Sequence, residues 1–196
     1  MGYQHNSGVK ITSNSYAYVR EYKKQLLKNI TELFNDLDIR FVIANGNLIE
    51  YERNNPIYHD DDLDIRFNKD DFDKWENFCK KTYSMLYRYN LTFDDRYNNI
   101  NQQKINGIQA RLIKFNNDNN ITELPKMNIL CDVVCSCVTN KFWMDYDINF
   151  NELRKINLYE VDTYAPSETD SHKVLKKEYG DNYLIPNKKL FFKVGK

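Results

Sequence analysis

The sequence has no long apolar run, no net charge and no paired cysteine motif, and each absence excludes a class of protein. No stretch of the 196 residues approaches the roughly 20 apolar residues that a membrane-spanning helix needs. Lysine plus arginine total 28, as do aspartate plus glutamate. This balance argues against stable, non-specific nucleic-acid binding, which requires a net basic surface. The polar amino terminus lacks an apolar segment, so no signal peptide is expected.

The four cysteines contain no C-x-x-C pair, so neither a zinc knuckle nor a thioredoxin-type motif is predicted. Cys131, Cys135 and Cys137 fall on one face of a predicted strand, and Asp132 falls on the other. We expect these three to be buried, reduced thiols. Such thiols predict a reducing compartment, the cytoplasm.

The remaining composition predicts a soluble globular protein with a substantial core, since 41% of residues are hydrophobic and 29% are charged. We expect the α+β fold class. Residues 1–14 are polar and are expected to form a disordered tail, with a single domain over 15–196. Apolar positions at three- and four-residue steps predict a helix from about Tyr16 to Asp36. Its other face carries the basic residues Arg20, Lys23, Lys24 and Lys28, and we expect that face to be solvated.

The rest of the chain alternates between predicted strands and helices. Asn68 is a predicted cap for one helix, and Ser167 opens another as an S-x-x-D capping box that ends near Gly180. The predicted strands cover residues 41–44, 60–67, 85–93, 107–115 and 127–134, with a β segment within 155–164.

One acidic stretch is the most informative part of the sequence, His59-Asp60-Asp61-Asp62-Leu63-Asp64-Ile65-Arg66-Phe67. If it is a strand, Asp60, Asp62, Asp64 and Arg66 share one face, and the apolar residues share the other. Carboxylates roughly 6–7 Å apart on one face repel one another. A divalent cation removes this conflict, and Mg²⁺ bound by oxygen ligands leaves positions for water and substrate phosphate.

This stretch has two other possible interpretations. An EF-hand calcium loop is excluded, because its sixth position requires glycine and is Ile65 here, and its twelfth is Asp71 rather than glutamate. A solvated acidic turn before a strand remains open from composition alone.

Two further features point to phosphate chemistry. Asp132 lies in the middle of the apolar segment 127–134, where a lone carboxylate is costly unless it is paired or bound to metal. Asn45-Gly46-Asn47 follows a predicted buried strand as a turn, and its backbone amides would form an anion nest. A plain strand-ending turn fits that tripeptide equally well.

The order of these features resembles the nucleotidyltransferase fold, and within it the LicD family, which includes the fukutin-related proteins. That family's pattern runs G-T-L-L-G-x-x-R, W-D-D-D-I-D-I, an apolar strand with an acid, and Y-G-x-x-W-x-x-P. The resemblance spans roughly residues 30–187. The matching segments are Gly46-Asn47-Leu48-Ile49-Glu50-Tyr51-Glu52-Arg53, His59-Asp60-Asp61-Asp62-Leu63-Asp64-Ile65, Leu130-Cys131-Asp132-Val133-Val134 and Tyr179-Gly180-Asp181-Asn182-Tyr183-Leu184-Ile185-Pro186.

The resemblance implies a fold and a reaction. The fold is a nucleotidyltransferase-like mixed sheet with helices packed on it. The reaction is metal-dependent transfer of a phospho-alcohol, such as phosphocholine or ribitol phosphate, from a CDP-linked donor to a glycan hydroxyl. Asp62 and Asp64 would hold Mg²⁺ or Mn²⁺. Asp132 would complete the site or accept the proton of the attacking hydroxyl, and Asp60 would bind a second ion.

The resemblance also implies a phosphate-binding set. Gly46 and Asn47 would contact the donor phosphate, and Arg53 would clamp it through charge-assisted hydrogen bonds. This chain departs from the family pattern at Asn47, which replaces threonine or serine, and at Glu50, which replaces glycine.

Two other functions are compatible with the same carboxylates. One is a nucleotidyltransferase that moves NMP from an NTP to a small molecule, a protein or RNA. The other is a non-catalytic binding module, for which loss of a metal-ligating aspartate would have been the signal; none is lost.

Overall fold

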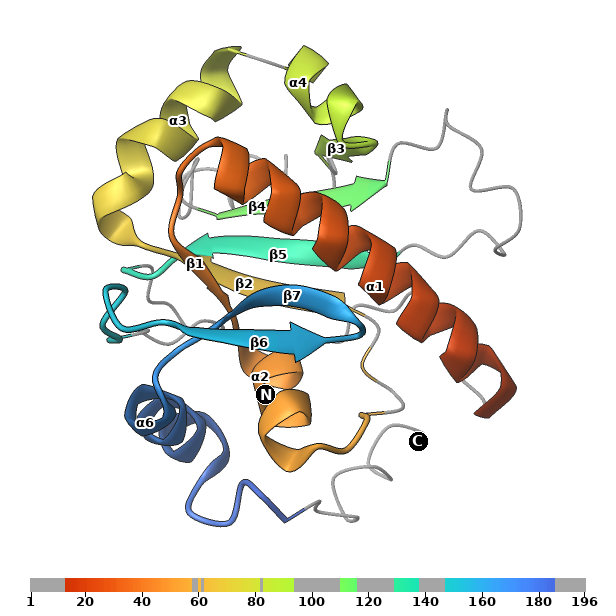
Figure 1. Ribbon diagram of the computed structural model, residues 1–196, viewed down its shortest axis with the longest axis vertical. Helices are drawn as coiled ribbons and strands as arrows, with labels where there is room; N and C mark the ends of the chain where they lie inside the picture. Colours follow the sequence, from red (N-terminus) through yellow and green to blue (C-terminus); the bar gives the residue numbers. More distant parts are fainter. Residues whose placement is uncertain are drawn as a thin grey trace, which may run out of the picture.

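The computed structural model describes residues 13–57, 60, 62–81, 83–93, 110–115, 129–137 and 147–185. Helices and strands alternate along most of this chain (Figure 1). The helical elements are α1 (Ser13–Asp36), α2 (Asn45–Arg53), the 3-10 turn η1 (Lys69–Asp71), α3 (Phe72–Lys81), α4 (Tyr83–Arg88) and α6 (Glu168–Tyr179). The strands are β1 (Phe41–Ile43), β2 (Asp62–Phe67), β3 (Leu91–Phe93), β4 (Ala110–Phe115), β5 (Leu130–Cys135), β6 (Arg154–Leu158) and β7 (Val161–Ala165).

Five of the described strands form one sheet in the order β1-β2-β5-β4-β3. The central pair, β2 and β5, is parallel, and the other pairs are antiparallel. The mixed sheet and α+β class predicted from the sequence are therefore confirmed. Strands β6 and β7 form a separate hairpin that packs against β1 and α1.

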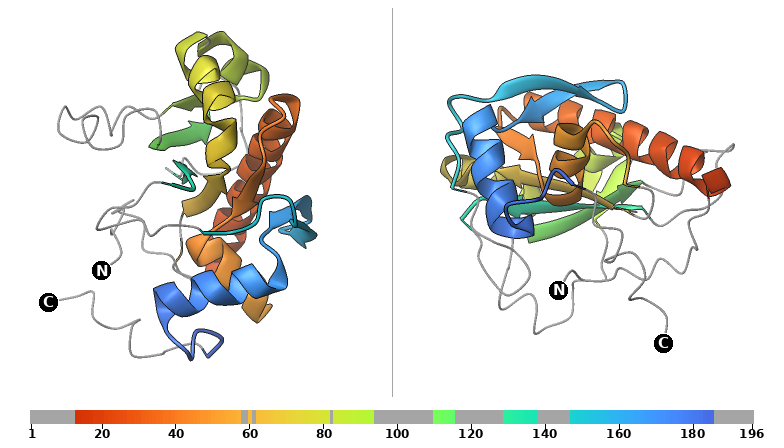
Figure 2. Two further views of the ribbon diagram at one scale, coloured as in Figure 1. Left: turned by 90° about the vertical axis from the view of Figure 1, so that its left-hand side faces the viewer. Right: turned by 90° about the horizontal axis from the view of Figure 1, so that it is seen from below.

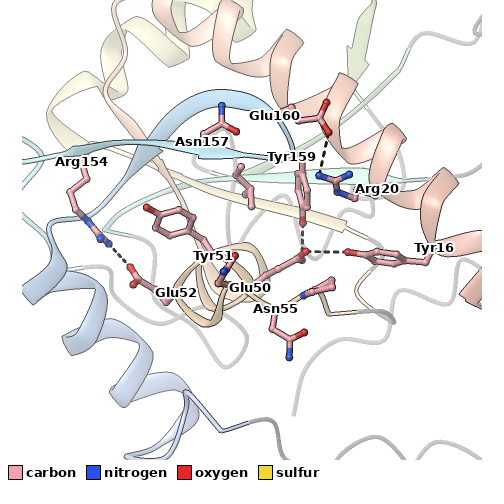
Figure 3. A pocket seen from close by; sticks show the side chains of 13 residues that line it. Tyr16, Arg20, Glu50, Tyr51, Glu52, Asn55, Arg154, Asn157, Tyr159 and Glu160 are labelled. Carbon is pink, nitrogen blue, oxygen red and sulfur yellow. Dashed lines mark hydrogen bonds and ion pairs between the residues drawn. The ribbon is translucent and has the colours of Figure 1, made fainter.

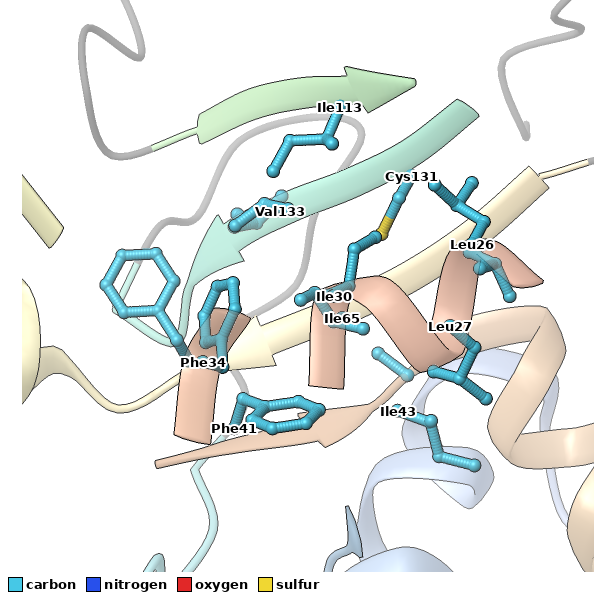
Figure 4. Packing of buried hydrophobic residues seen from close by; sticks show 14 of the residues in the cluster. Leu26, Leu27, Ile30, Phe34, Phe41, Ile43, Ile65, Ile113, Cys131 and Val133 are labelled. Carbon is cyan, nitrogen blue, oxygen red and sulfur yellow. The ribbon is translucent and has the colours of Figure 1, made fainter. Parts of the chain in front are cut away.

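Helix α1 covers one face of the sheet and supplies much of the core (Figures 1, 2 and 4). Its apolar residues recur at the predicted helical spacing, and Leu26, Leu27, Ile30 and Phe34 are fully buried. They meet the apolar face of the sheet, where Ile65 on β2 lies near the helix (Figure 4). This packing fixes which face of β2 points inward, because a one-residue shift would reverse every side chain of the strand.

Three helix boundaries follow the predicted capping signals. The Asn68 side chain accepts a hydrogen bond from the Asp70 amide at 3.2 Å, and Ser167 accepts one from the Asp170 amide at 3.2 Å. Gly180 ends α6 with a φ of 84°, a conformation that favours glycine. Both caps are confirmed, and the β segment predicted within 155–164 forms the β6–β7 hairpin.

Three local predictions were wrong. The predicted strand at 85–93 is helical through Arg88, and only Leu91–Phe93 forms β3. Asn45-Gly46-Asn47 is not a turn but the first turn of α2. The tail prediction for residues 1–14 fails at its end, because α1 already begins at Ser13; residues 1–12 lie outside the described residues.

The cysteine prediction is confirmed in part. Cys131 and Cys135 are fully buried, but Cys137 lies beyond the end of β5 and is exposed. All four cysteines are free thiols. Among the described residues, no helix is both long enough and apolar enough to cross a membrane.

Candidate functional site

Three predicted metal-ligating aspartates lie on two adjacent strands of the sheet. Asp62 and Asp64 lie two residues apart on β2 and therefore share a face. Asp132 lies on β5, and its Cα is the register partner of Asp64. Side chains of paired residues on neighbouring strands project to the same side of a sheet. The pattern that predicted aspartates on two adjacent strands is thus confirmed by the pairing, and the opposite face of both strands packs into the core.

The acidic site consists of Asp62, Asp64 and Asp132, of which Asp64 and Asp132 are buried and Asp62 is half-buried. Asp64 and Asp132 are each 7% exposed. Burial raises the pKa of Asp64 well above its usual range, and the nearby charge of Asp132 adds to the rise. Burial likewise raises the pKa of Asp62, with further contributions from Asp64 and Asp60. Like charges held together in a low-dielectric setting need an added positive charge or a proton.

The first turn of α2 holds Asp64 in place. The Asn45 side chain donates from Nδ2 to Asp64 Oδ1 at 3.0 Å, and the Asp64 amide donates to Asn47 Oδ1 at 2.7 Å. Asn45 adopts a left-handed φ of 44°, a conformation that asparagine tolerates better than most residues. Asn47, predicted as a phosphate contact, is fully buried, so its side chain is a brace between α2 and β2.

Gly46 lies beside Asp60. A Cβ atom on Gly46 would lie 2.8 Å from Asp60 Oδ2, which is shorter than Cβ contacts in proteins. Because glycine has no Cβ, the Asp60 carboxylate can approach the helix this closely. Asp60 is not part of β2, which begins at Asp62; the face alternation predicted for residues 60–66 therefore starts later than expected. His59 and Asp61 lie outside the described residues.

Lys23 pairs with Asp60, contrary to the prediction that it lies on a solvated basic face. Its Nζ is 2.8 Å from Asp60 Oδ2, and the residue is only 2% exposed. Burial alone would lower the pKa of Lys23, but Asp60 more than offsets this and the pKa is raised. The apolar stripe of α1 is wide enough to bring Lys23 inward beside Tyr22, and a buried ammonium then requires an anionic partner.

The structure does not bring Arg53 to the aspartates. Arg53 is the last residue of α2, and eight residues of helix separate it from Asn45 by roughly 12 Å along the axis. Its Nε donates to the Tyr183 carbonyl oxygen at 2.6 Å, and its Nη2 donates to the same atom. The bond links α2 to the segment after α6, so the matched Arg53 and Tyr179-Gly180 motifs meet each other; Pro186 lies outside the described residues.

Two buried charges beside the acidic site had no assigned role from sequence. Arg66 lies on the acidic face of β2, is fully buried, and lowers the pKa of Asp64. Glu178 approaches from α6, and burial raises its pKa to about 7 despite the charge of Arg66. Its Oε2 is buried without a hydrogen-bond partner among the described residues. The alternation pattern indicates the position of Arg66, whereas no local pattern indicates Glu178.

The chain matches no protein-family model, and no curated protein is significantly similar to it. Function is therefore inferred from the residues of the site and their chemistry.

Proposed function

We propose that this protein is a metal-dependent transferase of the nucleotidyltransferase fold that moves a phospho-alcohol from a CDP-linked donor to a glycan hydroxyl. The observation that carries the proposal is the register of Asp64 with Asp132 on adjacent parallel strands, two residues from Asp62. A structural role for such a set is disfavoured, because burying like charges together destabilises a fold. The choice of a CDP-alcohol donor is supported by the resemblance to the LicD family.

The donor set suits Mg²⁺ or Mn²⁺. Carboxylate oxygens are the ligands that both ions prefer, and the thiol of Cys131 lies on the opposite face of β5. As the side chains stand, no three acidic, histidine or cysteine side chains among the described residues converge closely enough to hold an ion. Asp64 is held by a hydrogen bond from Asn45. Binding would draw Asp62, Asp64 and Asp132 together.

The residues of the site have different roles in the transfer. When bound, the metal ion spreads the charge of the donor pyrophosphate and of the departing CMP. The acceptor hydroxyl oxygen forms a bond to the phosphorus of the phospho-alcohol, and the bond from that phosphorus to the CMP oxygen breaks. Asp132 accepts the hydroxyl proton or completes the ligand set, and Asn45 and Asn47 fix Asp64. The first turn of α2 also provides a local field that favours phosphate, since helix N-termini attract anions.

Product analysis tests the proposal. The protein is incubated with Mn²⁺ and CDP-choline, CDP-ribitol or an NTP, with and without a mixture of glycan acceptors, beside the Asp62→Ala variant. CMP release that is lost in the variant is the expected result. Pyrophosphate release from an NTP without CMP release would replace the proposal with the nucleotidyltransferase alternative. No product from any donor would leave the binding module as the better description.

A further inference from the structure

A separate pocket of about 780 Å³ lies between α1, α2 and the tip of the β6–β7 hairpin (Figure 3). Its volume is in the range of pockets that bind small molecules. Aromatic and charged side chains from all three elements line it, among them Tyr16, Glu50, Tyr51, Arg154, Tyr159 and Glu160. The described loop residues Asn54, Asn55 and Pro56 close one side.

Glu50 is the central polar group of this pocket (Figure 3). The Tyr159 hydroxyl donates to its Oε2 at 2.8 Å, and the Tyr16 hydroxyl donates to its Oε1 at 3.3 Å. The residue is 7% exposed. A carboxylate has about four lone-pair positions, so each oxygen of Glu50 retains capacity to accept a further hydrogen bond from a ligand hydroxyl.

The charges of the pocket disfavour an anionic ligand. The wall carries three carboxylates and two arginines, and both arginines already face a carboxylate. Arg20 is 3.4 Å from Glu160, and Arg154 pairs with Glu52. A phosphate entering this pocket would meet Glu50 with no unmatched arginine to receive it. Neutral ligands that donate hydrogen bonds avoid this repulsion, and tyrosine rings offer them an apolar surface with a polar edge.

The pocket and the acidic site share a wall. Asn47, which accepts the hydrogen bond from the Asp64 amide, donates from Nδ2 to the Tyr159 hydroxyl at 3.4 Å, and Tyr159 in turn donates to Glu50. Glu50 lies one turn along α2 from Gly46, or roughly 6 Å by the rise of a helix. The hydrogen bonds of Asn47 and Tyr159 therefore connect the pocket to Asp64.

The hairpin tip that forms part of this wall is strained. Tyr159 and Glu160 both adopt left-handed φ angles, 53° and 65°, in a two-residue turn where asparagine and glycine are the residues normally favoured. Strain of this kind persists where the surroundings hold it, and it is concentrated at functional sites. Here it places the Tyr159 ring in the pocket and its hydroxyl on Glu50.

We propose that this pocket binds the acceptor, as a neutral, polyhydroxylated sugar whose hydroxyls donate to Glu50. The inference rests on the proposed function for its link to catalysis and assigns that reaction a substrate subsite. The donor, which carries a pyrophosphate, binds instead at the aspartates and the first turn of α2. For the transfer to occur, the acceptor hydroxyl must extend from the pocket past Asn47 and Tyr159 to the phosphorus of the donor, because the new bond forms only when the two atoms meet.

Saturation-transfer NMR with a matched pair of probes tests the inference directly. N-acetylglucosamine and N-acetylglucosamine 6-phosphate differ only in the phosphate, and each is titrated into the full chain without donor. We expect the neutral sugar to bind at least tenfold more tightly than its phosphate. Glu50→Gln should weaken binding of the neutral sugar tenfold or more, and Tyr16→Phe should weaken it severalfold.

Tyr89→Phe is the matched control for Tyr16→Phe, because the Tyr89 hydroxyl also donates to a carboxylate, that of Asp36, at a position outside the pocket. It should leave sugar binding unchanged. The thermal midpoint of each variant verifies folding, and Tyr16→Phe serves if Glu50→Gln fails to fold.

Three results would overturn the inference: no binding of the neutral sugar, equal binding by wild type and the pocket variants, or tighter binding of the phosphate with loss in Glu50→Gln. CMP release by the wild-type protein is measured separately. Sugar binding without CMP release would reject the proposed function and keep the pocket, whereas CMP release without sugar binding would do the reverse.

Discussion

Two buried aspartates near β2 have opposite surroundings. Asp64, on the strand, is 7% exposed, and Asp71, in the turn that follows the strand, is 4% exposed. Asp71 accepts hydrogen bonds at 3.0 Å from both the amide and Nε of Arg40 and lies 3.2 Å from Lys74 Nζ. Burial alone would raise the pKa of Asp71, but the hydrogen bonds from Arg40 and Lys74 outweigh it and lower the pKa.

Asp64 shows the reverse balance. Burial and the charge of Asp132 outweigh the influence of Arg66, so its pKa is raised. A carboxylate surrounded by cations lowers the free energy of the folded chain, whereas clustered carboxylates raise it until something positive binds. The comparison separates an aspartate that serves the fold from one that serves the site.

The largest expected difference between the two is in catalysis. Asp64→Asn should reduce CMP release from a CDP-alcohol by roughly 10³-fold, the scale seen when a preorganised electrostatic contact is lost. Asp71→Asn should change the rate constant less than about threefold, because Asp71 lies outside the acidic site and residues at separate sites act independently. Steady-state rates at saturating Mn²⁺ measure both. Equal loss in the two variants would remove the distinction between them.

Stability should change in opposite directions. Asp71→Asn should lower the free energy of unfolding by about 1–3 kcal/mol, because it removes the buried charge that the partly exposed Arg40 and Lys74 side chains bind. Asp64→Asn should raise it or leave it within about 0.5 kcal/mol, because a repelling charge is removed. Urea unfolding at pH 7 in EDTA gives both values. A stabilised Asp71→Asn variant would contradict this assignment.

Asp60 sharpens the comparison because its pairing with Lys23 makes it resemble Asp71. Asp60→Asn should lower CMP release by only about tenfold, the lower end of effects for groups that support metal ligands. Asp62→Asn should match the loss in Asp64→Asn. If Asp60→Asn is as inactive as Asp62→Asn, then Asp60 holds an ion directly, as the sequence first indicated.

A further expected effect concerns pH. Glu178 has a pKa raised from 4.5 to about 7, so the folded chain binds a proton there that the unfolded chain has released. The stability from this group is fully present below pH 4.5 and is lost as the pH rises through about 7. Glu178→Gln should flatten the fall in unfolding free energy between these values, by up to about 1.4 kcal/mol per pH unit. Urea unfolding from pH 5 to 7.5 tests this, and parallel curves would contradict it.

Local patterns account for much of the fold and of the acidic site. Alternating residues from Asp62 to Phe67 determined which face of β2 is buried, and an isolated acid among apolar residues marked Asp132. Ser167 and Gly180 indicated both ends of α6. Each of these signals lies within a few residues of the structure it predicts.

The errors arose where the decisive contact is distant in the sequence. The sequence predicts a solvated position for Lys23 because its partner, Asp60, is 37 residues away along the chain. Arg53 is predicted to bind phosphate, and the sequence does not indicate its hydrogen bond to the Tyr183 carbonyl oxygen, which is 130 residues away. Residues 85–88 belong to α4 rather than to a strand. Leu86 packs in the core, and tertiary packing of this kind overrides a strand-like composition.

Whether the acidic site binds a divalent ion can be measured directly. Isothermal titration calorimetry with Mn²⁺ compares the wild-type protein with Asp64→Asn and Asp71→Asn, which remove one carboxylate charge each from two similarly buried positions. We expect the wild type and Asp71→Asn to bind the ion with the same affinity and Asp64→Asn not to bind it. Equal binding by all three proteins, or loss of binding in Asp71→Asn alone, would contradict the claim that the clustered aspartates form a metal site.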